Sequence, residues 1–172
     1  IYMLPESADN MDIRIYESVE FPTKWQLKTI IKENVSAADS MIFSHKGIWW
    51  LFSNINPIGG RDCCSELSIF YPDNPIEGKW VPHEKNPVIF DPSSARNGGM
   101  VLDHDSLYRV GQIQTFGTYG GGGVCINQIV ELSASKYKEQ NVLKLYPEFQ
   151  QGVKGVHHFH SDDGITVFDF LK

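Results

Sequence analysis

The sequence has few cysteines and few positive charges, and it lacks a long apolar run. Its three cysteines, Cys63, Cys64 and Cys125, are odd in number and two are adjacent, so they do not provide a disulfide framework. This favours a reducing compartment, and we expect the cytoplasm. Fifteen Lys and Arg against 21 Asp and Glu give a net charge of -6, which argues against nucleic-acid binding because that needs a dense basic face. No apolar run approaches the ~20 residues of a membrane-spanning helix, so we expect no membrane span.

Glycine, proline and aromatic residues are abundant. The 172 residues include 15 Gly, 9 Pro, 10 Phe, 7 Tyr and 4 Trp. Short aromatic and β-branched segments separated by turn formers are typical of an all-β fold. The chain is long enough for one hydrophobic core. We therefore predict a single all-β domain.

A strand–turn–strand unit recurs along the chain. Three segments have this layout: residues 41–52, 100–110 and 158–168. Met41 and Met100 lie 59 positions apart, and Trp25 and Trp80, which end a second recurring unit, lie 55 apart. Each full repeat then holds four short antiparallel strands, here called a to d, as a β-propeller blade does. The alternative is a β-sandwich with accidental spacing.

The repeat divides the chain into parts of four blades. These are the end of blade 1 (1–33), blade 2 (34–90), blade 3 (91–148) and the start of blade 4 (149–172). The strands do not tile into complete blades, so we expect part of a five-bladed propeller. Another part of a longer chain, or another subunit, would complete it and cover the open strand edges. The tryptophans recur at blade spacing and are expected in the core: Trp25, Trp49, Trp50 and Trp80.

The long connections all fall on one predicted face of the propeller. In an up-and-down blade, the b–c and d–a connections emerge on the same side, and these are the long ones: residues 53–65, 112–123, 32–38, 84–96 and 146–155. Long loops on a rigid scaffold are where binding residues concentrate. On this face the first residues of each strand a would surround the central channel.

Polar and charged side chains are expected around the rim of that channel. They are Glu6 in blade 1, Asp39 in blade 2, Arg96 and Asn97 in blade 3, His157 and His158 in blade 4, and Arg61 and Tyr119 on the long loops above. An acid, an arginine, an amide and a histidine around one cavity can hold a polyhydroxylated ligand.

Less specific roles are open for some of these residues. Asp39 could cap a turn before its strand, and Arg96 could pair with Asp91 to fix a loop. His158 and His160 share one strand face, but no third ligand follows at a clear spacing. We therefore predict no metal site, and we expect no cofactor.

Several motifs together give the sequence a family resemblance. They are Tyr2-Met3-Leu4-Pro5-Glu6-Ser7, Ile13-Arg14-Ile15-Tyr16, Phe21-Pro22-Thr23-Lys24-Trp25, Ala38-Asp39-Ser40, Gly47-Ile48-Trp49-Trp50-Leu51-Phe52, Ser94-Ala95-Arg96-Asn97-Gly98-Gly99, Leu107-Tyr108-Arg109-Val110-Gly111-Gln112 and Tyr119-Gly120. Over nearly its whole length the chain resembles the five-bladed propeller domain at the N-terminus of plant glucosamine inositolphosphorylceramide transferases and their bacterial relatives. That domain is in turn similar to the superfamily of glycoside hydrolase families 43 and 32. The resemblance implies a carbohydrate-related role with a saccharide or glycoconjugate as ligand, and Arg109 and Gln112 join the predicted substrate-binding residues.

Two functions are compatible with this resemblance. In a glycoside hydrolase or transglycosylase, Asp39 would be the base or a pKa-tuning acid, Glu6 the proton donor, and Arg96, Asn97 and His158 would orient sugar hydroxyls. In a non-catalytic glycan-recognition or scaffolding propeller attached to a transferase, Arg96 would bind an anionic group. Glycoside hydrolysis generally needs two carboxylates, and Glu6 with Asp39 is the only such pair in the predicted set. The superfamily's first-blade aspartate would lie before Ile1, so we expect an incomplete hydrolase site in this chain.

Overall fold

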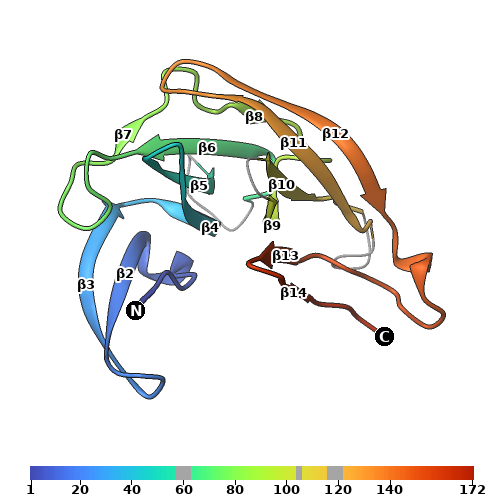
Figure 1. The fold of residues 1–172 in the computed structure, drawn as a ribbon, viewed down its shortest axis with the longest axis horizontal. Helices are drawn as coiled ribbons and strands as arrows, with labels where there is room; N and C mark the ends of the chain where they lie inside the picture. The colour runs from blue at the N-terminus through green and yellow to red at the C-terminus, as the bar shows by residue number, and fades with distance from the viewer. Residues whose placement is uncertain (57–62, 104–105, 116–121) are drawn as a thin grey trace. The chain divides into compact units, whose positions relative to one another are not determined.

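The protein is built from β-strands, as its composition predicts (Figure 1). The computed structural model describes residues 1–56, 63–103, 106–115 and 122–172. Within these residues there is no α-helix, and two 3-10 turns, η1 (Ala8–Asn10) and η2 (Pro147–Phe149), are the only helical elements. No helix in these described stretches is long and apolar enough to span a membrane.

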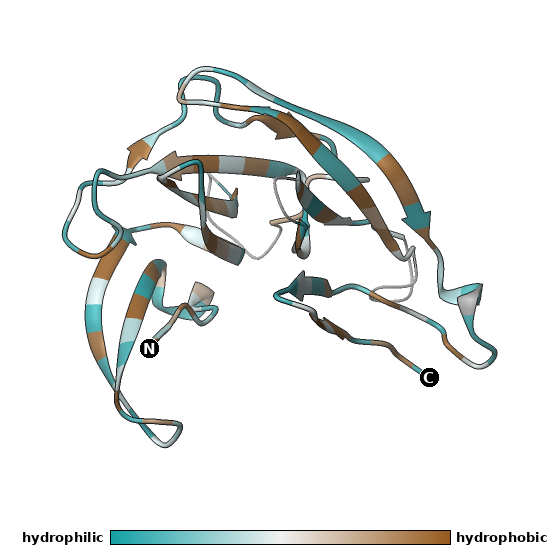
Figure 2. Cartoon of the chain, in the orientation of Figure 1, coloured by the Kyte–Doolittle hydropathy of each residue, from teal (hydrophilic) through white to brown (hydrophobic). Residues whose placement is uncertain are grey.

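The strands fall into groups that follow the chain. They are β1 (Tyr2–Met3), β2 (Asp12–Glu20), β3 (Lys24–Glu33), β4 (Ser36–His45), β5 (Ile48–Asn56), β6 (Glu66–Tyr71), β7 (Val81–Pro82), β8 (Ile89–Phe90), β9 (Asn97–Asp103), β10 (Ser106–Gln112), β11 (Val124–Leu132), β12 (Tyr137–Leu145), β13 (Phe159–Asp162) and β14 (Ile165–Phe168). Hydrophobic and hydrophilic residues alternate along β2, β3 and β11, the pattern of strands with one face toward a core (Figure 2).

The chain forms two compact units, which are described separately. Unit 1 comprises residues 1–63 and 67–88, and unit 2 comprises residues 64–66 and 89–172. Each unit has a hydrophobic cluster of its own. The sequence predicts a single domain and does not anticipate this division.

Unit 1 contains two antiparallel strand series. One has the order β1-β2-β3 and the other β4-β5-β6-β7. The β4–β5 hairpin turns at Lys46 and Gly47, which have φ values of 51° and 76°, as a two-residue turn of type I′ requires. A buried cluster of side chains from these strands forms its core: Ile13, Ala37, Leu51, Phe70 and Trp80.

Unit 2 contains one six-stranded sheet of order β12-β11-β10-β9-β13-β14. The pairs are antiparallel except that β13 runs parallel to β9, where Ser161 lies opposite Val101. Val110 of β10 and Val124 of β11 are buried together with Val156. The predicted boundary between blades 3 and 4 at residue 148 stays a prediction.

The tryptophans do not all behave as the repeat predicts. Trp50 and Trp80 are buried, at 2% and 8% exposure, whereas 39% of Trp49 is exposed. Trp49 and Trp50 are adjacent in β5, so they point to opposite faces and only one can enter the core. The prediction of a core position is thus wrong for Trp49. Trp25 is only half-buried, and its indole N–H donates to the carbonyl oxygen of Pro22 at 2.9 Å.

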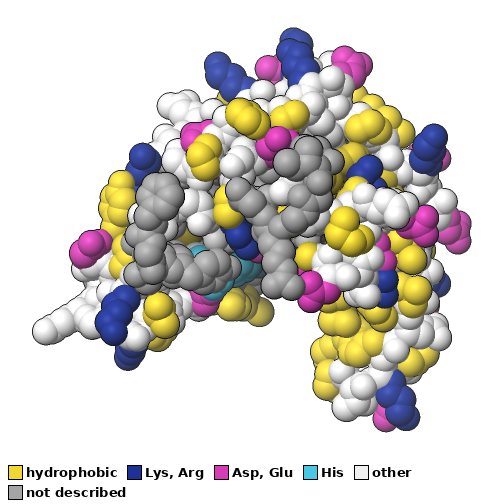
Figure 3. Space-filling model, turned by 180° about the vertical axis from the view of Figure 1, so that it is seen from behind, with side chains coloured by type: hydrophobic (Ala, Val, Ile, Leu, Met, Phe, Trp, Pro, Cys, Tyr) yellow, Lys and Arg dark blue, Asp and Glu magenta, His cyan; other side chains and the backbone are white. Residues whose placement is uncertain are grey.

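Charged side chains of both signs are interspersed over the face in Figure 3. Hydrophobic side chains gather over the β2–β3 hairpin on the same face. The exposed apolar residues of that hairpin include Val19, Phe21, Leu27 and Ile30.

Candidate functional site

The two predicted acids lie together in unit 1. Asp39 lies in β4 at a bulge, because the pairing with β5 shifts register between Ala38 and Met41. Its φ of 48° is in the left-handed region, a conformation that costs free energy outside glycine and is better tolerated by Asp than by most residues. The backbone N–H of Asp39 donates to Oε2 of Glu6 at 3.5 Å. The bulge therefore places the two carboxylate-bearing residues side by side.

The chain around Glu6 is fixed by its neighbours. Ser7 is buried and its hydroxyl donates to the carbonyl oxygen of Asp12 at 2.7 Å. The carboxylate of Asp12 in turn accepts hydrogen bonds from the guanidinium of Arg14, which lower the pKa of Asp12. Glu6 is thus an exposed acid on an anchored segment.

In unit 2, a buried ion pair holds the segment before Arg96. Arg109 is fully buried, and its Nε and Nη2 donate to the carboxylate of Glu139 at 2.8 and 2.7 Å. Its Nη2 also donates to the carbonyl oxygen of Ser94 at 2.8 Å. Burial is the largest single influence on Arg109 and favours its neutral form. The hydrogen bonds that Arg109 donates to Glu139 and the charge of that carboxylate together outweigh burial and raise the pKa of the guanidinium. Arg109 is therefore engaged by internal hydrogen bonds, and its predicted role in substrate binding stays a prediction.

The predicted polar residues at the start of β9 lie close to Gln112. Asn97 is the first residue of β9 and is buried, and its carbonyl oxygen accepts a hydrogen bond from Nε2 of Gln112 at 2.6 Å. Gly99 follows with a φ of 119°, and a Cβ there would lie 2.2 Å from the carbonyl oxygen of Phe159. The two glycines at 98 and 99 are thus explained by close backbone packing against residues 157–159.

The histidines directly before β13 are held by an aspartate that sequence reasoning missed. Oδ1 of Asp169 accepts the backbone N–H groups of His157 and His158 at 3.1 and 2.8 Å. Oδ2 of Asp169 pairs with Nδ1 of His157. The rings of His158 and His160 stack with centroids 6.5 Å apart. Asp169 is a lone acid between Phe168 and Phe170, and no spacing in the sequence links it to the histidines.

Arg96 directly precedes β9, and its Nη1 donates to Sγ of Cys64 at 3.3 Å. The carboxylate of Asp91 accepts hydrogen bonds from Ser93 and Ser94 of its own loop, and the backbone N–H of Ser93 contributes most to lowering its pKa. Two further predicted binding residues, Arg61 and Tyr119, lie outside the described residues. No group of three or more His, Cys, Asp or Glu side chains suited to a metal ion occurs where the structure describes the chain.

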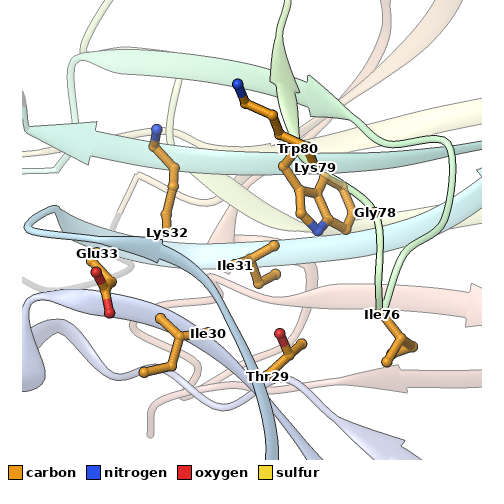
Figure 4. Close-up of a pocket in the computed structure, with 9 residues that line it drawn as sticks. All are labelled: Thr29, Ile30, Ile31, Lys32, Glu33, Ile76, Gly78, Lys79 and Trp80. Atoms are coloured by element: carbon orange, nitrogen blue, oxygen red, sulfur yellow. The ribbon is translucent and has the colours of Figure 1, made fainter.

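A groove that the sequence did not indicate lies in unit 1, between β3 and the β6–β7 connection (Figure 4). Its volume is about 410 Å3, within the usual range of small-ligand pockets. We call it the β3 groove. It is lined by Thr29, Ile30, Ile31, Lys32, Glu33, Ile76, Gly78, Lys79 and Trp80.

Comparison with known proteins gives one consistent result. A family model described as "Glucosamine inositolphosphorylceramide transferase 1, N-terminal" matches residues 1–163. A protein of Arabidopsis thaliana named glucosamine inositolphosphorylceramide transferase 1 is 36% identical over 168 residues, which cover 94% of this chain and 21% of the relative. Proteins of the same name from the japonica and indica subspecies of Oryza sativa are each 34% identical, with 94% of this chain and 22% of the relative covered.

The chain thus spans about a fifth of the length of these curated relatives. No solved structure matches it.

Proposed function

Because this chain belongs to the family of N-terminal domains of glucosamine inositolphosphorylceramide transferase 1, we propose that it is a non-catalytic glycan-recognition or scaffolding domain of a glycosyltransferase-type protein. One observation carries the proposal. The family model covers residues 1–163, while about four fifths of each transferase-named relative lies outside the match. A domain of this kind would hold a saccharide for a reaction that another part of the protein carries out.

The proposed architecture is a β-propeller of the five-bladed type, with the blade boundaries given by the sequence repeat. It is supported by the antiparallel strand orders β4-β5-β6-β7 and β12-β11-β10-β9. Both orders have four strands that follow one another along the chain, as the strands of a blade do.

The proposed ligand is a saccharide, bound by the predicted rim residues. In unit 1, the carboxylates of Asp39 and Glu6 would accept hydrogen bonds from sugar hydroxyls. In unit 2, Arg96 would bind an anionic group, His157 and His158 would offer further polar groups, and the buried Asn97 would position this segment. Arg61 and Tyr119 remain proposed contacts. Because Arg109 and Gln112 are bonded to the backbone of residues 94–97, we assign them a positioning role.

Saccharide binding tests this proposal directly. Glucosaminyl-inositol, chosen because the relatives' name contains both groups, is titrated into the full chain and followed by NMR. Asp39→Asn should weaken binding about tenfold, since a charge-assisted hydrogen bond is lost. Asp163→Asn is the matched control, because Asp163 has nearly the same backbone conformation as Asp39, with a φ of 47° against 48°. Equal affinities of the two variants would refute the rim assignment.

Glycoside hydrolysis or transglycosylation is the second candidate function. It is favoured by the contact between Glu6 and the strained Asp39, because strained backbone concentrates at functional sites. Asp39 would be the base or a pKa-tuning acid and Glu6 the proton donor. Hydrolysis of aryl glycosides by the full chain, abolished in both Asp39→Asn and Glu6→Gln, would establish this function in place of the non-catalytic one.

A further inference from the structure

The floor of the β3 groove is apolar and continuous with the core of unit 1. Trp80 is 8% exposed and belongs to the buried cluster, and Ile31 packs against that cluster. In Figure 4 the indole nitrogen of Trp80 points toward Ile31 across the groove. Because this floor consists of core residues, it cannot collapse without disrupting the packing of unit 1. The core therefore maintains the groove.

The wall opposite β3 is a preformed loop. Oδ1 of Asn74 accepts the backbone N–H groups of Ile76 and Glu77, each at 2.9 Å, and the N–H of Gly78 donates to the carbonyl oxygen of Asn74 at 2.9 Å. A Cβ on Gly78 would lie 2.4 Å from that oxygen, so only glycine closes the loop. Because this loop is already ordered, binding of a ligand in the groove would cost little conformational entropy of the loop.

The groove carries two lysines that have no carboxylate partner among the residues that the structure describes. Nζ of Lys32 lies 4.6 Å from the centroid of the Phe70 ring. Neither Lys32 nor Lys79 forms an ion pair with any residue that the structure describes. Figure 4 shows both lysines extending to the same side, whereas the carboxylate of Glu33 points the other way. The charge on this side is therefore positive and suits an anion.

We propose that the β3 groove binds the phosphate ester of a small ring-shaped polyol in solution. Lys32 and Lys79 would bind the phosphate oxygens with charge-assisted hydrogen bonds, and Ile31, Ile76 and Trp80 would contact the C–H face of the ring. The inference that the ligand is an anion rests only on the two lysines of the groove. The choice of a polyol rests on the proposed carbohydrate-related function.

Titration of the full chain with myo-inositol 1-phosphate tests this inference, with the Trp80 indole N–H signal as a local NMR probe. Lys32→Gln and Lys79→Gln should each weaken binding about tenfold. Lys144→Gln in β12 is the matched control, because Lys144 is an exposed strand lysine outside the groove. Circular dichroism of each variant checks that it folds.

Each result has a defined meaning. Equal weakening by Lys144→Gln and the groove variants would overturn the site, since only net charge would then matter. Inorganic phosphate binding as tightly as the ester would overturn the polyol assignment. Binding to phosphatidylinositol vesicles without binding of the free ester would overturn the soluble ligand in favour of a lipid headgroup. The rim proposal is tested with glucosaminyl-inositol and Asp39→Asn, and the groove proposal with the ester and the groove lysines, so failure of one is distinguishable from failure of the other.

Discussion

Arg109 and Glu139 form a buried ion pair. Replacing one member should lower the unfolding free energy more than replacing both. Glu139→Gln leaves the guanidinium of Arg109 buried without its countercharge, so we expect a loss of about 3–5 kcal/mol of unfolding free energy. Replacing both residues, as in Arg109→Met with Glu139→Leu, should cost less than Glu139→Gln alone, because no charge remains buried. Urea unfolding of the three proteins measures this. A double variant that is less stable than the single one would contradict the pair's assigned role.

The same pair shows the limit of residue-level prediction. Arg109 lies between buried Leu107 and Val110, and its acidic partner is 30 positions away in β12, so the sequence offers no sign that the guanidinium turns inward. Strand starts are more predictable, since turn chemistry and apolar runs define them. Asn97 opens β9 as expected, and His158 directly precedes β13.

At the scale of the element, the outer edge of β6 is completed by a side chain. Nδ2 of Asn86 donates to the carbonyl oxygen of Ile69 at 2.7 Å, and Oδ1 of Asn86 accepts the Ile69 N–H at 2.8 Å. Asn86→Ala should lower the unfolding free energy by about 1–3 kcal/mol, because the Ile69 N–H loses its partner while the Ile69 carbonyl oxygen keeps only the hydrogen bond from the His83 N–H. It should also speed hydrogen exchange at the Ile69 amide. Asn10→Ala, at an exposed asparagine of η1, is the control, and equal losses in the two variants would contradict this role.

Turns and strands could be predicted where the local sequence alone determines their conformation. The β4–β5 hairpin turns at Lys46 and Gly47 as its sequence indicates, because the turn conformation depends only on those residues. The register shift at Asp39 was not foreseen, since a bulge depends on pairing with a strand whose position the sequence does not state. The β3 groove was missed for a related reason: its two walls are joined only by tertiary packing.

At the scale of the whole molecule, the sequence repeat can be compared with the observed strand order, although the division into blades stays a prediction. The predicted strands of residues 1–33 form the β1-β2-β3 sheet, and the four strands of residues 91–148 are neighbours in the sheet of unit 2. The repeat could not indicate that β13 pairs with β9, because that contact joins segments about 60 positions apart through one parallel pair. A sequence repeat predicts pairing between strands that follow one another along the chain. It does not predict pairing between strands that are far apart in the sequence.

The two compact units lead to a prediction about local stability. Leu51 in unit 1 and Leu107 in unit 2 are 0% and 2% exposed, so each Leu→Ala substitution should cost about 2–5 kcal/mol through lost burial and the cavity left behind. Because each unit has its own buried cluster, hydrogen exchange below the global transition should quicken mainly in the unit that carries the substitution. Leu51→Ala should therefore expose amides of β4 and β5 while those of β10 and β11 keep their protection, and Leu107→Ala should do the reverse. Equal acceleration in both units by either variant would mean that the chain opens as a single cooperative body.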